Sequence, residues 1–239
     1  MNERREIDPL DARLSGILAV LSHELRNPLN AILGWATTLA RRSELPEPVM
    51  HGLQAIERNA RLQARMIADL VDYAAISAGE VRLALETIDP YPVVRAAIAG
   101  AAAAAHEAGV AVEASFDAES LRIAADAARL EQLIANLLSN AVKFSGRGAT
   151  VRIAARRSGE SFQLVVRDQG KGIDPGSLPR IFERFGLHGS ARRSHGGLGL
   201  GLAMVKQIAD LHSGTVRAES AGQGQGATFI FELALCDAT

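Results

Sequence analysis

The sequence predicts an α+β protein in which a long helical hairpin precedes a unit of alternating strands and helices. In the first third of the chain, apolar residues recur at the helical spacing of three and four positions. From about Val81 onward, short segments rich in β-branched and aromatic residues alternate with helical segments. We therefore expect two domains, residues 8–80 and residues 81–236.

The first predicted helix begins near Asp8, which can cap it, with Pro9 at the first helical position. A segment with two prolines, residues 44–48, ends it. Its apolar stripe is centred opposite His23 on the helical wheel. The stripe consists of Leu14, Ile17, Leu18, Leu21, Leu25, Ile32, Ala36 and Leu39.

The second predicted helix runs from about Val49 to Ile76, and Gly79 is its stop signal. Leu53, Ile56 and other apolar residues recur along it at helical spacing. A single hairpin cannot bury the apolar stripes of both helices. We therefore expect two copies of the chain to form a four-helix bundle as a homodimer.

The second domain is predicted to contain five strands and three helices. The expected strands are residues 110–116, 150–157, 162–168, 215–220 and 227–233. The expected helices are residues 92–108, 127–144 and 201–211. The glycine-rich segment 186–201 carries little hydrophobic signal, and long segments of that kind are usually functional.

The composition excludes several classes of protein. The net charge is -1 and aromatic residues make up 4% of the 239 residues, which argues against nucleic-acid binding. The single cysteine, Cys236, excludes a disulfide within the chain and favours a reducing compartment. No apolar run approaches the roughly 18 residues that span a bilayer, so we expect no membrane contact within this chain.

Residues 22–29, Ser-His-Glu-Leu-Arg-Asn-Pro-Leu, contain the sharpest local signal. Most single histidines on helices are ordinary surface or core residues. The wheel argues against a core position for His23, which faces away from the apolar stripe with Glu24 and Asn27 on its side. A histidine accepts a phosphoryl group only if one ring nitrogen is free to attack, and a nearby carboxylate can take the proton from the other.

The predicted helix 127–144 carries Asn136, Asn140 and Lys143 on one polar stripe. An ordinary solvated face is the alternative, but such faces favour Glu and Lys over Asn, a poor helix former. Neutral amide oxygens suit Mg²⁺, which is held by a few protein oxygens together with substrate phosphates. Lys143 can add a positive charge toward a phosphate.

Two glycine-rich motifs follow. Asp168 ends a predicted strand and is followed by Gly170 and Gly172. Its carboxylate can accept a hydrogen bond from an exocyclic amine, and the glycines allow close approach of the backbone. The alternative is a plain glycine turn. The segment 196–202 opens a predicted helix, and glycine-rich backbone at a helix N-terminus binds anions. It is not a P-loop, because no Gly-Lys-Ser/Thr follows.

Together, in this order, these motifs resemble the catalytic core of sensor histidine kinases. The resemblance covers residues from about Leu14 to Leu235 and places the second half in the ATPase superfamily of Hsp90, MutL and gyrase. It implies that this half is an α/β sandwich with a mixed sheet. It also implies that His23 is the phosphorylated residue, Glu24 the base, and Asn27 a helper in dephosphorylating the partner.

For the nucleotide, the resemblance implies that Asn140 coordinates Mg²⁺ and Asp168 binds the adenine amine. The implied ATP-binding set is Asn136, Asn140, Lys143, Asp168, Gly170, Gly172, Phe182, Gly197, Gly199, Leu200, Gly201 and Thr228. Phe182 belongs to a phenylalanine motif at the base of the lid over ATP. The chain departs from the family where Ser213 replaces a frequent glycine.

The implied function is ATP-dependent phosphorylation of His23, followed by transfer to an aspartate of a response regulator in the cytoplasm. Three alternatives remain: an ATPase of another class in the superfamily, a scaffold with a degenerate ATP site, and a protein that acts mainly as a phosphatase. The hairpin motif argues against the first alternative. The intact nucleotide motifs argue against the second, and the third stays open.

Overall fold

The computed structural model describes residues 25, 27–41, 45–117, 120–183 and 199–236. The chain falls into two compact units, the first ending at Arg82 and the second beginning at Leu83. The predicted start of the first helix, including His23, lies outside the described residues. Among the described helices, none combines the length and apolar character needed to cross a bilayer.

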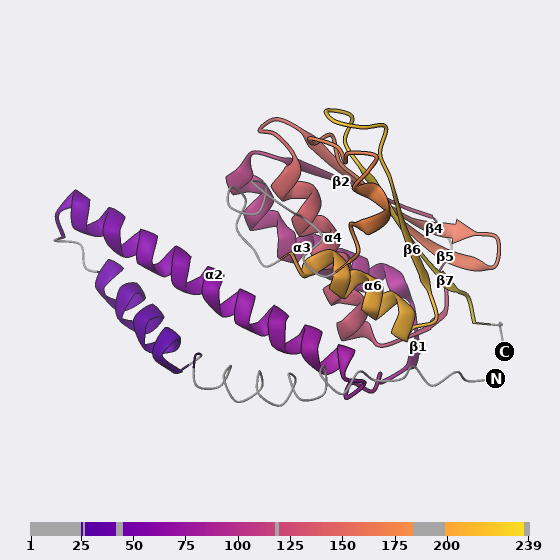
Figure 1. Ribbon diagram of the computed structural model, residues 1–239, viewed down its shortest axis with the longest axis horizontal. Helices are drawn as coiled ribbons and strands as arrows, with labels where there is room; N and C mark the ends of the chain where they lie inside the picture. The colour runs from indigo at the N-terminus through magenta and orange to yellow at the C-terminus, as the bar shows by residue number, and fades with distance from the viewer. Residues whose placement is uncertain (1–24, 26, 42–44, 118–119, 184–198, 237–239) are drawn as a thin grey trace. The chain divides into compact units, whose positions relative to one another are not determined.

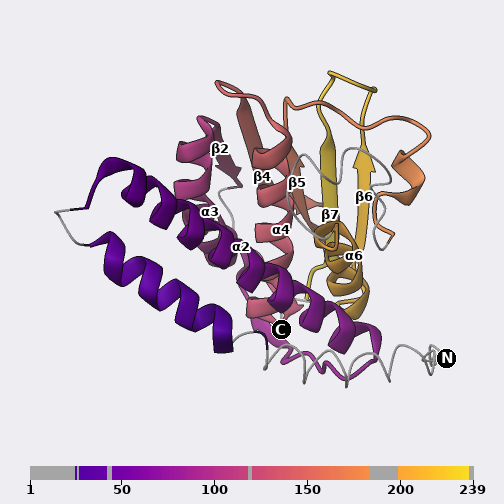
Figure 2. The same cartoon turned by 60° about the vertical axis from the view of Figure 1, so that its left-hand side comes forward.

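The first unit is a helical hairpin. Residues 27–40 are helical, and the 31-residue helix α2 spans Glu47–Ser77. The two helices run side by side in opposite directions (Figures 1 and 2). Helix α2 ends where Gly79 takes a left-handed conformation, with φ of 70°, and donates its N–H to the carbonyl of Ile76 at 3.0 Å. The predicted stop signal therefore lies at the observed end.

The hairpin buries only part of its apolar surface. Ala36 and Leu53 of the predicted apolar stripes are buried, and so are Leu29 and Ala60, which the stripes did not include. A further group of large apolar side chains remains exposed on the same pair of helices. It consists of Leu25, Ile32, Trp35, Val49 and Ile56, of which Trp35 is 69% exposed.

The second unit is built on a five-stranded mixed sheet with the order β2-β4-β5-β7-β6. The strands are β2 Ala111–Phe116, β4 Thr150–Ser158, β5 Ser161–Arg167, β6 Thr215–Glu219 and β7 Thr228–Ala234. β2 and β4 pair in parallel, and every other neighbouring pair is antiparallel. Two short strands, β1 Glu86–Ile88 and β3 Ile123–Ala125, form a separate antiparallel pair. The predicted mixed sheet is confirmed.

Three helices cover one face of this sheet: α3 Pro90–Ala108, α4 Ala127–Phe144 and α6 Gly201–Leu211 (Figures 1 and 2). A short 3₁₀ helix, η1 Leu178–Arg180, follows the glycine turn. The core lies between the helices and the sheet, where Leu137 of α4, Phe162 of β5 and Phe231 of β7 are fully buried. The second half is therefore an α/β sandwich, as expected.

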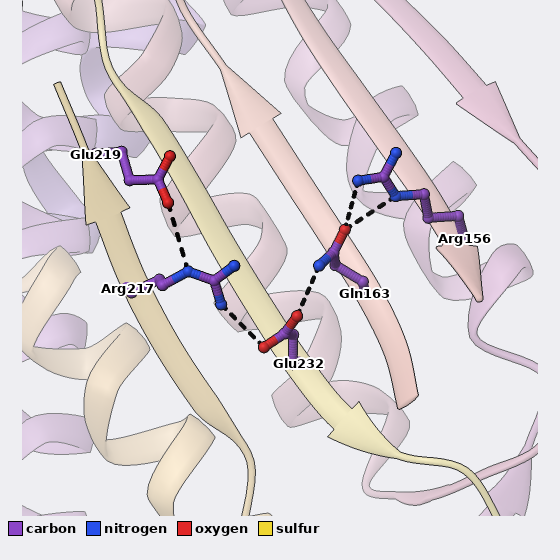
Figure 3. A network of polar contacts seen from close by, with 5 residues as sticks. All are labelled: Arg156, Gln163, Arg217, Glu219 and Glu232. Carbon is purple, nitrogen blue, oxygen red and sulfur yellow. Dashed lines mark hydrogen bonds and ion pairs between the residues drawn. The ribbon is translucent and has the colours of Figure 1, made fainter. Parts of the chain in front are cut away.

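The opposite face of the sheet carries a chain of polar contacts across four strands (Figure 3). Arg156 donates to the amide oxygen of Gln163, whose Nε2 donates to Glu232 at 2.6 Å. Arg217 bridges Glu232 and Glu219 from the edge strand β6. The hydrogen bond from Gln163 and the contact with Arg217 hold the pKa of Glu232 below its ordinary value.

Helix α6 ends in a turn that suits glycine better than serine. Ser213 has a φ of 56°, which makes it the one described non-glycine residue with a positive φ. This is the position where the resemblance described above leads one to expect glycine. The left-handed conformation costs a non-glycine residue about 1–2 kcal/mol.

Candidate functional site

The polar stripe of α4 begins from a well-defined cap. Asp126 precedes the helix, and its Oδ1 accepts the N–H of Arg129 at 3.1 Å. Leu130, Leu133 and Leu137 bury the opposite side of α4 in the core. The helix therefore cannot rotate, and its polar stripe is held in one direction.

Asn136 and Asn140 are half-buried on this stripe and lie against the start of α6. A Cβ placed on Gly201, the first residue of α6, would lie 3.6 Å from Nδ2 of Asn140 and 3.7 Å from Oδ1 of Asn136. Backbone N–H groups at a helix N-terminus attract anions. Neutral amides beside such a terminus fit a phosphate with its Mg²⁺, since amide oxygens can coordinate the ion and amide N–H groups can donate to phosphate.

Asp168 follows β5 and is 5% exposed. Its Oδ1 accepts the backbone N–H of Gly170 at 2.8 Å and that of Ala227 at 3.2 Å. Burial raises the pKa of Asp168, and the two amide donors partly oppose that rise. Oδ2 accepts no hydrogen bond from any described residue, so a fixed acceptor remains for the amine of a base.

The glycine turn after Asp168 is packed against backbone. A Cβ on Gly170 would overlap the carbonyl oxygen of Phe144 at the end of α4, and one on Gly172 would overlap that of Gly222. Gly172 also has a φ of 69°, which disfavours other residues. Both predicted glycines are therefore required by close approach of the chain.

Phe182 and Thr228 lie near the glycine turn that follows Asp168. The ring of Phe182 lies edge-on to that of Phe229 in β7, with centroids 6.5 Å apart. Thr228 is the first residue of β7 and directly follows Ala227, whose N–H donates to Asp168. The structure thus brings Phe182, Thr228 and Asp168 to one end of the strands β5 and β7.

Lys143 lies one turn after Asn140, and its ammonium group is 5.2 Å from the centroid of the Phe144 ring. Burial, and secondly the positive charge of Lys171, lower the pKa of Lys143. Gly199, with a φ of 72°, and the buried Leu200 lead directly into α6. Gly197 lies outside the described residues.

Of the predicted residues His23, Glu24 and Asn27, the structure describes only Asn27, which belongs to the first unit. Asn27 is exposed on the helix 27–40, while His23 and Glu24 lie outside the described residues. Within the described ranges, no three His, Cys, Asp or Glu side chains cluster to hold a metal ion.

Sequence reasoning missed the segment 220–226, which supports the glycine turn. Gly224 donates its N–H to the carbonyl of Lys171 at 2.7 Å, and Gly226 donates to that of Gly170 at 3.1 Å. Ser220 Oγ accepts the N–H of Ile173 at 3.0 Å. The alternating glycines Gly222, Gly224 and Gly226, all with positive φ, were the signal that could have identified it.

Two family models match the chain. Residues 13–79 match the His Kinase A (phospho-acceptor) domain. Residues 125–236 match the histidine kinase-, DNA gyrase B- and HSP90-like ATPase. The first match contains the predicted phosphoacceptor motif, and the second contains the whole predicted nucleotide set.

Curated relatives are also histidine kinases. The sensor-like histidine kinase SenX3 of Mycobacterium tuberculosis is 34% identical over 98% of this chain, which covers 57% of that relative. The histidine protein kinase DivJ of Caulobacter vibrioides is 33% identical over 96% of this chain and 39% of its own length. The chain thus spans little more than half the length of SenX3.

Solved structures of other histidine kinases are also similar to this chain. The crystal structure of full-length ShkA, described as a complex with AMPPNP, matches with a TM-score of 0.76 and 30% identity. The match covers 94% of this chain and 46% of ShkA. The Acinetobacter baumannii histidine kinase AdeS shares the fold with a TM-score of 0.64 at 22% identity, over 90% of this chain and 98% of that one. With a phosphoacceptor domain followed by an ATPase domain, the chain belongs to the sensor histidine kinases.

Proposed function

We propose that this chain is the catalytic core of a protein histidine kinase, which uses ATP to phosphorylate His23 and then passes the phosphoryl group to an aspartate of a response regulator. The observation that carries the proposal is the position of Asn136 and Asn140 against the first residue of α6. The buried carboxylate of Asp168 lies in the same unit and offers an acceptor for the base.

In the nucleotide site, Asp168 would bind the adenine amine through its Oδ2. Asn140 would coordinate Mg²⁺, while Asn136 and Lys143 approach the phosphates. Mg²⁺, when bound, supplies neutralisation of the charge on the phosphates. Gly199, Leu200 and Gly201 would line the entry to α6, with Gly197 before them, and Phe182 and Thr228 would close the base end of the site.

In the hairpin, His23 would be the nucleophile and Glu24 the base that takes the proton from its other ring nitrogen. Asn27 would assist the removal of phosphate from the response regulator. Its exposed position on the helix 27–40 supports this role, because a docked partner can reach it. We place the hairpin domain at residues 8–80 and the ATP-binding domain at residues 81–236.

We further propose that the chain works as a homodimer in the cytoplasm. Ile32, Trp35 and Ile56 support the dimer, since they leave an apolar strip exposed on the two helices of the hairpin. Shallow apolar hollows lie along the same strip, lined in part by Leu29 and Leu53. A second hairpin would cover this strip in a four-helix bundle.

The proposal is tested with ATP labelled at its γ-phosphate. The chain should acquire label that is lost in acid and kept in alkali, as expected for a phosphohistidine. The His23→Gln variant should not be labelled, whereas His51→Gln, which changes an exposed histidine of α2, should be labelled like the wild type. Equal labelling of His23→Gln and wild type would disprove the assignment of the acceptor.

A further inference from the structure

Two lysine ammonium groups flank the ring of Phe144, at the last turn of α4. The Nζ of Lys171 lies 4.2 Å from the ring centroid, and that of Lys143 lies 5.2 Å from it. Lys143 and Phe144 come from α4, whereas Lys171 comes from the glycine turn after Asp168. The turn therefore adds a second positive charge beside the nucleotide site.

The backbone of Lys171 is held on both sides. Its N–H donates to the carbonyl of Phe144 at 3.2 Å, and its carbonyl accepts the N–H of Gly224 at 2.7 Å. The close packing of Gly170 on the same Phe144 carbonyl leaves the turn no room to shift. The turn thus fixes the backbone of Lys171, while its side chain is exposed.

Among the described residues, no carboxylate neutralises the charge of Lys171. Lys171 forms no ion pair with any described residue, and the nearby carboxylate of Asp168 is directed toward the amides of Gly170 and Ala227. The neighbouring positive charge also lowers the pKa of Lys143, after the larger effect of burial. Two like charges held close together repel each other, and a bound anion would relieve that repulsion.

We propose that Lys171 is a second phosphate-binding lysine of the nucleotide site, which acts together with Lys143 on the anionic end of a nucleoside triphosphate. The inference rests on the proposed ATP-dependent function. The triphosphate is the occupant because Lys143 shares its helix stripe with Asn136 and Asn140, and because an adenine ring offers no negative charge. The flexible four-carbon stem of Lys171 lets its ammonium swing from the Phe144 ring to a phosphate.

The test distinguishes the effect of the Lys171 charge from the effect of its packing against the Phe144 ring. Lys171→Met keeps an apolar stem and a sulfur contact with the Phe144 ring while removing the charge. Affinities for ATP and adenosine would be measured on the full chain by titration calorimetry. We expect Lys171→Met to weaken ATP binding about 3- to 10-fold, as for the loss of one partly exposed charged contact. Adenosine binding should change less than about 2-fold, since adenosine carries no charge for the lysine to attract.

Two further variants act as controls. Lys171→Arg should bind ATP nearly as well as the wild type, because the positive charge remains. Lys206→Met removes an exposed lysine of α6 that is paired with Asp210 at 2.6 Å, and ATP affinity should not change. The difference between wild type and Lys171→Met should also shrink as salt is raised.

The outcomes are distinct. Equal ATP affinity in wild type and Lys171→Met would overturn the role of Lys171 and leave the proposed kinase intact. An equal loss of ATP and adenosine binding would also overturn it, because Lys171 would then act through the Phe144 ring. A wild-type chain that binds neither compound would refute the proposed ATP-dependent function itself.

Discussion

The ring of His212 joins the end of α6 to the start of α4. Its Nε2 accepts the backbone N–H of Asp126 at 3.1 Å, and its Nδ1 lies 2.8 Å from the carbonyl oxygen of Ile208. An amide N–H can only donate and a carbonyl can only accept, so the two contacts fit the tautomer with its proton on Nδ1. The buried His212 therefore helps to set the cap of the helix that carries Asn136 and Asn140.

His212→Ala should lower the free energy of unfolding by about 1–3 kcal/mol, because the Asp126 N–H loses its acceptor inside the fold. Urea unfolding followed by circular dichroism measures the change. The control is His106→Ala, which alters an exposed histidine of α3 and should cost less than about 0.5 kcal/mol. Equal effects of the two substitutions would contradict the bridging role.

Asp126 should make stability depend on pH. Burial raises the pKa of Asp126, but hydrogen bonds from the amides of Arg129 and Ala84 outweigh it, so the pKa lies below the ordinary 3.8. The stabilisation is complete above pH 3.8 and is lost as the pH falls through the lower folded value. Asp126→Asn should keep the cap but show a weaker loss of stability in this acid range. Matching acid profiles for the variant and wild type would exclude this role for the carboxylate.

Gly170→Ala should disrupt the nucleotide site. The added Cβ would overlap the Phe144 carbonyl, so the turn after Asp168 must move. We expect ATP affinity to fall by at least about 10-fold, equivalent to about 1.4 kcal/mol. Gly146→Ala is the matched control, because a Cβ there meets no atom within 4 Å. Normal ATP binding by Gly170→Ala would show that the turn tolerates displacement.

Asn140→Asp should greatly reduce labelling of the chain by ATP. The substitution places a negative charge where a neutral amide faces the start of α6, and it alters the proposed Mg²⁺ site. We expect at least about a 10-fold lower labelling rate, a change of about 1.4 kcal/mol in the barrier. Glu131→Gln, an exposed change on α4, should label normally. Unchanged labelling of Asn140→Asp would argue against Mg²⁺ at this residue.

A truncated chain that starts near Val81 should still bind ATP but should be a monomer, since it lacks the exposed apolar strip of the hairpin. Light scattering gives its mass, and calorimetry gives its ATP affinity. The full chain serves as the dimeric reference. A dimeric truncation would contradict the proposal that the hairpin holds the two copies together.

The sequence predicted the long elements of the second unit well. The expected helices 127–144 and 201–211 coincide with α4 and α6, because strong apolar periodicity, the Asp126 cap and a glycine boundary mark them. The short strands β1 and β3 were not predicted, since three residues are too few to show alternation. The bond between His212 and Asp126 joins residues 86 positions apart, and no local pattern encodes such a contact.

The candidate site was predictable where motifs are local. Helical spacing predicted the polar stripe with Asn136 and Asn140, and the resemblance to sensor histidine kinases supplied its proposed role and that of the glycines near Asp168. The proposed role of Lys171 could not be predicted, because its contacts depend on the Phe144 ring and on Gly224, which lie far from it in the sequence. The support given by residues 220–226 was missed although the alternating glycines Gly222, Gly224 and Gly226 are a local signal.

The bond from Ala227 to Asp168 bears on how the protein is made. Asp168 is synthesised 59 residues before Ala227, and β7 lies between β5 and β6 in the sheet. A nascent chain whose β7 is still inside the ribosome therefore lacks the Ala227 N–H that donates to Asp168. It also lacks the strand that pairs with β6. We expect the growing polypeptide to bind nucleotide only after β7 has left the ribosome.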